Sequence, residues 1–175
     1  ALDKETEDLI KKLDELGEKQ EKLSEKETDT QEEQEQIDKE FEKIQDDIKK
    51  LDKKGDELKK PTDFQEKTKA EQAEIKKEQQ KAKENMSESQ DKKANDNQKK
   101  AGQKMQEMAE QMSEMKKSSE AQQQAEDMES LRAILENLIQ LSFDEEDLIE
   151  QSKNISSSDP KINQLSQAQK DIKDN

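Results

Sequence analysis

A seven-residue repeat of apolar side chains runs through the first third of the chain and limits its fold more than any other feature. With Leu2 at heptad position d, 11 of the 17 a and d positions up to Leu58 are apolar. Such a repeat is typical of an α-helix that buries one stripe against another helix in a left-handed coiled coil. Its weakest part lies between Gln20 and Gln34, where Leu23 is the only apolar residue on the stripe.

The composition excludes a thick globular core. Of the 175 residues, 25% are hydrophobic and 45% are charged, so the apolar material is enough for a narrow stripe along long helices. The abundant Lys, Glu, Gln, Leu and Ala favour helix, and only three Gly and two Pro interrupt them. The absence of Cys excludes a disulfide framework and a thiol nucleophile. No apolar run reaches the length of about 18 residues that a membrane-spanning helix needs.

Pro61 divides the helical pattern. Proline disfavours helical geometry at the residue before it, and Thr62 or Asp63 can cap a new helix. The sequence therefore predicts a first coiled-coil helix over 1–59, a turn at 60–63, a second coiled-coil helix over 64–127 and a helical head over 128–175. A reversal at the turn places residue 59 minus k beside residue 63 plus k. The leucines of the N-terminus then meet the methionines after residue 104.

The predicted fold class is all-α: a long antiparallel two-helix coiled-coil hairpin with a small helical bundle at the end opposite the turn. A coiled coil between two molecules is the alternative that the stripes leave open. The bundle begins where the second helix outruns the first, and there the sequence becomes apolar on most sides of a helix, which must therefore be covered. Six residues form the candidate interaction surface: Leu131, Ile134, Leu135, Leu138, Ile139 and Phe143.

Two short helices are predicted to cover this cluster. Ser142 and Glu145 match the S-x-x-E capping box, which predicts a helix start after Leu141. Asp159 as N-cap with Pro160 in the first helical position predicts another start. The apolar residues of these two helices are Leu148, Ile149 and Ile155 in the first and Ile162, Leu165, Ala168 and Ile172 in the second.

Three charged or sulfur-rich features could carry chemistry, and each has a simpler structural explanation. The acids of 144–147 suit a helix start better than a metal site, because Ca²⁺ needs a tight loop that supplies six to eight oxygens. The methionines at 105, 108, 112 and 115 follow the spacing of a packed stripe. The lysines between 76 and 104 are balanced by acids, which favours a solvated face over a nucleic-acid site.

The sequence predicts no enzyme, no catalytic residue, no metal and no cofactor. It has no His, no Cys and no Gly-rich phosphate loop. The net charge of −15 predicts no binding to nucleic acid, and no direct membrane insertion is expected. Association with a protein partner or with a second copy, as in a homodimer, is the expected kind of interaction.

The stretch from Ala125 to Glu150, AEDMESLRAILENLIQLSFDEEDLIE, resembles a block of large, uncharacterised, membrane-anchored bacterial envelope proteins that have a C-terminal coiled-coil region. Their domain has no assigned function. The resemblance rests mainly on residues 131–148 and brings no catalytic residues. It implies that the chain is an excised, soluble segment of a membrane-anchored protein and faces the periplasm.

The function expected from these features is that of a non-catalytic structural module, a coiled-coil spacer that presents a helical head for partner binding or self-association. Two alternatives belong to other classes. A holdase-like chaperone would have splayed arms with exposed apolar inner faces, and would protect unfolded clients. A regulatory segment of a larger envelope protein would act on a catalytic site elsewhere in that protein.

Overall fold

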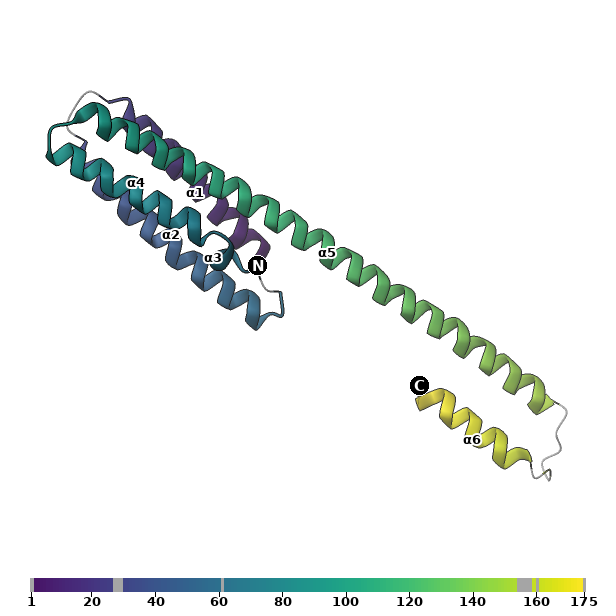
Figure 1. Cartoon of the computed structure of the whole chain (residues 1–175). Helices are drawn as coiled ribbons and strands as arrows, with labels where there is room; N and C mark the ends of the chain where they lie inside the picture. The colour runs from purple at the N-terminus through teal and green to yellow at the C-terminus, as the bar shows by residue number, and fades with distance from the viewer. Residues whose placement is uncertain (1, 27–29, 61, 154–158, 160, 175) are drawn as a thin grey trace. The chain divides into compact units, whose positions relative to one another are not determined.

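The computed structural model describes the chain apart from residues 1, 27–29, 61, 154–158, 160 and 175. Its described residues form helices and no strand, which confirms the predicted all-α class. The chain divides into two compact units, Ala1–Glu120 and Ala121–Asn175, and the fifth helix belongs to both. The helices in chain order are α1 (Leu2–Ser24), α2 (Gln31–Glu57), α3 (Phe64–Lys67), α4 (Lys69–Ser87), α5 (Asp91–Lys153) and α6 (Lys161–Asp174) (Figure 1).

The first unit is an antiparallel four-helix bundle made of α1, α2, α4 and the first part of α5, with α3 as a short turn before α4 (Figure 1). Side-chain contacts link each long helix to two neighbours. They are Lys19–Glu40 between α1 and α2 (3.0 Å), Lys83–Asp38 between α2 and α4 (2.7 Å), Asn85–Asn97 between α4 and α5 (2.8 Å), and Lys116–Glu7 between α5 and α1 (3.0 Å). The order of helices around the bundle therefore follows their order along the chain.

The predicted two-helix hairpin is wrong in its connectivity, because the expected helix over 1–59 is two helices and the expected second helix also breaks. Part of the predicted pairing survives. Gln45 donates to Gln72 across α2 and α4 (2.8 Å), and Lys116 reaches Glu7 across α5 and α1. Each of the two predicted long helices is divided by a further reversal, and the N-terminal leucines still pack near the methionines. In a four-helix bundle the apolar stripes are enclosed on all sides, whereas a two-helix hairpin leaves the edges of each apolar stripe exposed to water.

The first unpredicted reversal falls between α1 and α2, at the weakest part of the heptad stripe. Ser24 ends α1 and Thr30 precedes α2. Ser, Thr and Asp compete for backbone hydrogen bonds and therefore favour turns and helix ends over helix interiors. A helix continued through SEKETDT would have buried little, so folding back costs few contacts.

The second reversal connects α4 to α5 at residues 88–90, where Ser89 has a left-handed φ of 56°. Residues 95–97 are Asn, Asp and Asn, which have low helix propensity, but the break does not fall there. Those residues are helical, and the Asn97 amide is buried, accepting from Asn85 and donating to Glu78 at 2.7 Å. Asparagine is tolerated inside this helix because its side chain is fully used by its neighbours.

The reversal between α2 and α3 contains Pro61, which lies outside the described residues. Its cap comes from α2: the Asp52 carboxylate accepts hydrogen bonds from the backbone N–H groups of Phe64 (3.0 Å) and Gln65 (2.6 Å). The Thr62 hydroxyl also donates to Asp52. Asp63 occupies the N-cap position without a side-chain hydrogen bond, so the predicted capping by Thr62 or Asp63 is wrong. A carboxylate twelve and thirteen residues upstream satisfies these two free N–H groups and closes the turn.

The interior of the bundle contains one continuous apolar cluster. Phe41, Ile75 and Met105 are fully buried although they come from three different helices. Apart from Leu58, which is exposed, each a and d position of the heptad repeat that the structure describes is buried. The repeat therefore predicted which side chains enter the core, although it did not predict where the chain turns.

A buried pair of amides joins α1 to α2 near their connection. Gln20 donates to Gln34 at 2.8 Å, Gln34 donates back at 2.9 Å, and both side chains are fully buried. Reciprocal pairs of this kind fix the relative register of two helices, because a shift leaves polar atoms unsatisfied.

Gln34→Ala is expected to lower the free energy of unfolding by about 1–3 kcal/mol, because Gln20 would keep a buried amide without its partner. The double variant Gln20→Leu/Gln34→Leu removes both amides and is expected to lose less, because only the hydrogen bond from Gln34 to Asp38 is then left without a replacement. Urea unfolding followed by circular dichroism measures both. Equal losses in the two variants would show that the amide pair is not the cause.

The second unit contains the last part of α5 and α6. The predicted helix start after Leu141 is wrong, because α5 continues without a break to Lys153. Hydrogen bonds from Gln140 to Asp144 (2.9 Å) and from Gln151 to Asp147 (2.7 Å) bridge successive turns there and support the continuous helix. The predicted start at Asp159 is confirmed, since its carboxylate accepts from the Lys161 N–H at 2.9 Å. Pro160, Ile155 and the side chain of Ile172 lie outside the described residues.

Candidate interaction surface

The six residues of the predicted surface all lie on α5, and the structure leaves each of them exposed. The predicted three-helix head would have covered them, and it does not form in the described residues. Two further apolar side chains, Met128 and Ile149, are exposed on the same helix. We call these eight residues the α5 apolar face: Met128, Leu131, Ile134, Leu135, Leu138, Ile139, Phe143 and Ile149, each 54–72% exposed.

The apolar residues of this segment cover more than half of the helix circumference. At 3.6 residues per turn, the large apolar residues span an arc of about 220°, from Leu148 through Leu138 to Phe143. One neighbouring helix covers only about half of such an arc, since a stripe of about 100° suffices for one contact. The segment therefore offers room for two helical neighbours.

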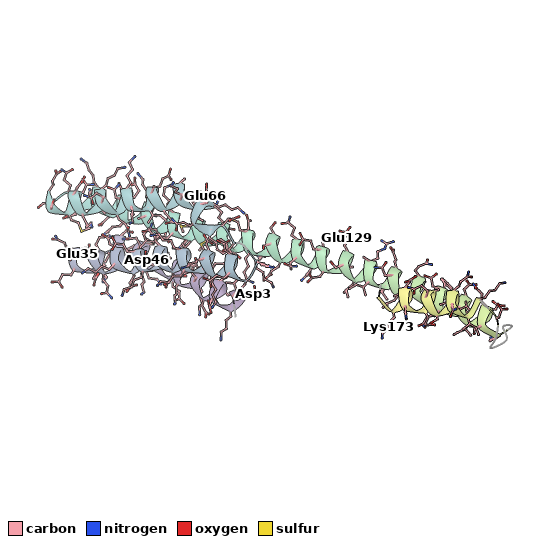
Figure 2. The ribbon with its side chains drawn as sticks, turned by 90° about the horizontal axis from the view of Figure 1, so that it is seen from below. Asp3, Glu35, Asp46, Glu66, Glu129 and Lys173 are labelled. Atoms are coloured by element: carbon pink, nitrogen blue, oxygen red, sulfur yellow. The ribbon has the colours of Figure 1, made fainter. Side chains whose placement is uncertain are left out.

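One edge of the arc is partly covered. Leu141 and Leu148 are half-buried, and so are Leu165 and Ala168 on α6, which lies alongside the end of α5 (Figures 1 and 2). The opposite edge, which contains Met128, Ile139 and Phe143, has no such cover. A continuous α5 thus explains the exposure: the residues after Leu141 extend the same helix and cannot fold over it.

Sequence reasoning missed Met128 and Ile149 because it assigned them to other elements. Met128 was placed at the boundary of the head, and Ile149 in a separate short helix. A helical projection would have found both residues, since Met128 lies seven residues before Leu135 and Ile149 eighteen after Leu131. Residues seven or eighteen apart share one side of a helix.

Carboxylates surround the α5 apolar face. Between residues 121 and 152 the chain has nine Asp or Glu and a single cation, Arg132, which pairs with Glu136 at 3.2 Å. Glu129 lies at the N-terminal end of the face on α5, and Lys173 belongs to α6 (Figure 2). The four acids at 144–147 are exposed near the C-terminal end of α5 and start no helix. Among the described residues, no three Asp or Glu side chains form a group that could hold a metal ion.

The methionine stripe belongs to the core of the bundle, as predicted. Met105, Met108 and Met112 are fully buried, and Met115 packs against them from the edge. The lysines of the middle segment lie on the outside or pair with acids, as Lys81 does with Glu78 (2.7 Å). These two features therefore contribute to packing and to the solvated surface of the first unit.

Glu78 is the carboxylate of the bundle whose environment most clearly differs from water. Burial acts to raise its pKa, but hydrogen bonds from Lys81 and from Asn97 outweigh burial and hold the pKa below its ordinary value. Because the pKa is lower in the folded chain than in the unfolded chain, the ionised group stabilises the fold at neutral pH. That stabilisation is lost as the pH falls through the folded pKa.

Glu78→Gln is therefore expected to lower the folding stability at neutral pH. Below about pH 4.5, the variant should lose less further stability than the wild type, because it has no carboxylate at this position to protonate. Thermal unfolding measured between neutral and acidic pH tests this. Glu129→Gln, at an exposed position outside the bundle, is the control and should keep the wild-type profile. The relief of net negative charge by acid acts on all three proteins alike. Parallel profiles for Glu78→Gln and the wild type would contradict the assigned role of Glu78.

Comparison with known proteins assigns no family. No family model, no curated protein and no solved structure matches the chain. Within the described residues, none of the helices combines the length and the apolar character needed to cross a bilayer. The role of the α5 apolar face is therefore inferred from its own side chains.

Proposed function

We propose that the chain is a non-catalytic structural and interaction module. In this proposal, the four-helix bundle holds the first part of α5, and the same helix carries the α5 apolar face for association with a protein partner or a second copy. The continuity of α5 through both units supports this division of roles, because one helix provides both the folded anchor and the exposed surface.

The contrast in burial between the two units carries the proposal. Within the described residues of the first unit, Leu58 is the one large apolar side chain found exposed, whereas the second unit exposes eight on α5. Single exposed apolar residues are ordinary, but a contiguous set on one helix is typical of a surface that associates. A chain with so few apolar residues has placed many of its largest ones on this surface.

A structural role also agrees with how the polar groups of the bundle are used. Buried amides bond to one another, as Gln20 does with Gln34, and carboxylates such as Glu7 and Asp38 pair with lysines. The closed core supports this role better than a holdase-like one, which requires splayed arms with exposed inner faces. We also propose, from the resemblance of residues 125–150, that the chain is a segment of a membrane-anchored envelope protein and acts in the periplasm.

Phe143→Trp tests whether the face is uncovered in the single chain. The sequence has no Trp and no Tyr, so the new side chain would be the only strong emitter. In dilute monomer, its emission is expected to resemble that of Trp in water and to be quenched by acrylamide. Phe64→Trp is the matched control: it replaces a Phe that is 1% exposed and should give blue-shifted, protected emission.

Protected emission from Phe143→Trp in a verified monomer would contradict the proposal, because the face would then be covered within the chain. Sedimentation at the same concentration establishes the monomer. The result is independent of which partner binds, so it tests the proposed surface separately from its occupant.

A further inference from the structure

We propose that the uncovered part of the α5 apolar face docks a basic amphipathic helix from a partner protein. This inference rests on the proposed function and specifies the chemistry of the partner. The shape of the surface, its charge and the character of α6 each support it.

The shape of the surface favours a helix as the occupant. Leu131, Leu135 and Leu138 recur at the spacing of four and three residues that forms one ridge along a helix. A second helix packs against such a ridge by placing its own side chains in the adjacent grooves. With α6 at one edge and the other edge open, a helix from a partner would complete a three-helix arrangement around the apolar arc.

The charge around the surface favours a basic occupant. Three acids, Glu126, Asp127 and Glu129, lie around the N-terminal end of the apolar face, and five more lie around its C-terminal end: Asp144, Glu145, Glu146, Asp147 and Glu150. Only Arg132 opposes them in this segment. Lysines or arginines beside the apolar stripe of a partner helix would meet carboxylates at both ends of the contact, which raises the association rate and penalises acidic competitors.

The chain itself provides an example of the preferred occupant. Helix α6 has an apolar edge, with Leu165 and Ala168 half-buried, and its fourteen residues include three Lys and two Asp. It lies alongside the acidic end of α5 in both figures. An amphipathic helix that is more basic than α5 therefore already occupies one edge of the arc, and the open edge has the same chemistry.

A second copy of the chain fits the surface less well. Two α5 segments brought face to face would each contribute nine acids and one Arg. An antiparallel pairing centred near Leu138 would bring Arg132 close to the acids of 144–147 of the other copy, but most carboxylates would remain unpaired. Self-association would therefore strengthen with added salt, whereas binding of a basic helix would weaken.

Three synthetic peptides provide the probes. The first, the Lys peptide, is helical and has Leu at positions i, i+3, i+4 and i+7 with Lys beside them. The second has Glu in place of each Lys. The third has the same composition as the Lys peptide, but its Leu residues are moved to positions that form no stripe. Fluorescence anisotropy of labelled peptide with the full chain measures affinity. We expect the Lys peptide to bind at least about ten-fold tighter than the other two peptides. Its affinity should fall as the salt concentration rises.

Two variants locate the binding site. Leu135→Ser/Ile139→Ser is expected to lower the affinity for the Lys peptide by about ten-fold or more. The helical content and the unfolding of the bundle should stay unchanged. Leu58→Ser is the matched control, because Leu58 is 53% exposed in the first unit, and it should bind as the wild type does. The same loss in Leu58→Ser would place the peptide elsewhere and overturn the inference.

Two further results would overturn the inference and leave the proposed function standing. In the first, none of the peptides binds although Phe143→Trp is exposed to water in the monomer. In the second, sedimentation shows a dimer that strengthens with salt, excludes the Lys peptide and is lost in Leu135→Ser/Ile139→Ser. The α5 apolar face would then belong to a second copy of the chain.

Discussion

Phe41→Ala is expected to lower the free energy of unfolding by about 3–5 kcal/mol, the largest effect of any single truncation considered for this chain. Phe41 lies in α2, is fully buried, and belongs to the apolar cluster shared by the helices of the bundle. Its removal leaves a cavity that the surrounding helices cannot fill without moving. Urea unfolding followed by circular dichroism gives the change.

Phe143→Ala is the matched control for this prediction. The residue type and the substitution are the same, but Phe143 is 61% exposed on the α5 apolar face. Its loss is expected to change the free energy of unfolding of the bundle by no more than about 0.5 kcal/mol. If Phe143→Ala destabilised the chain as strongly as Phe41→Ala, the face would be part of a folded core, and the proposed interaction surface would be wrong.

Gly102→Ala is expected to destabilise the bundle by about 1–3 kcal/mol although alanine favours helix. A Cβ at Gly102 would lie 2.7 Å from the carbonyl oxygen of Gly17 and 3.0 Å from the backbone nitrogen of Glu21, both in α1. Backbone atoms cannot rotate away as a side chain can. The axes of α1 and α5 would therefore have to separate, which loosens the neighbouring core contacts.

Ser118→Ala is the control for helix propensity, because Ser118 is exposed in the same helix. Ser118→Ala should raise the free energy of unfolding by a few tenths of a kcal/mol. Thermal unfolding of the two variants separates the propensity term from the steric one. A stabilised Gly102→Ala would show that α1 and α5 do not approach as closely as the structure indicates.

The heptad repeat predicted the core of the first unit well and its connections poorly. Positions such as Leu13 and Ile48 are buried where the repeat placed them, since burial depends only on which side of a helix a residue occupies. The turn between α1 and α2 contains no Gly and no Pro, so no strong local signal marks it. Its one indication was the polar stretch from Gln20 to Gln34.

The heptad repeat also did not predict the close approach of α1 and α5. Gly17 and Gly102 face each other across the two helices, but they are 85 residues apart in sequence and neither occupies an a or d position within a recognised heptad. Small residues that let two backbones meet become recognisable only when the pairing of helices is known. Local pattern therefore limits what can be predicted about packing between distant segments.

The candidate surface was predicted by its residues and not by its surroundings. The apolar cluster from Leu131 to Phe143 was evident from composition, and the sequence suggested that short helices would cover it. The capping box at Ser142 predicted a helix start, but Glu145 and Glu146 favour helix and no Gly or Pro interrupts the segment, so α5 continues through it. The expected core of a helical head became an exposed helical face.

The distance between spin labels at positions 5 and 54 tests the four-helix bundle most directly. In the folded unit, Lys54 of α2 pairs with Glu5 of α1 at 2.7 Å. With both residues changed to Cys and labelled, and the protein diluted with unlabelled chain, the labels should lie within about 20 Å, because neighbouring helix axes are about 8–10 Å apart. A continuous helix over 1–59 would separate the two positions by roughly 70 Å, and such a distance would contradict the bundle.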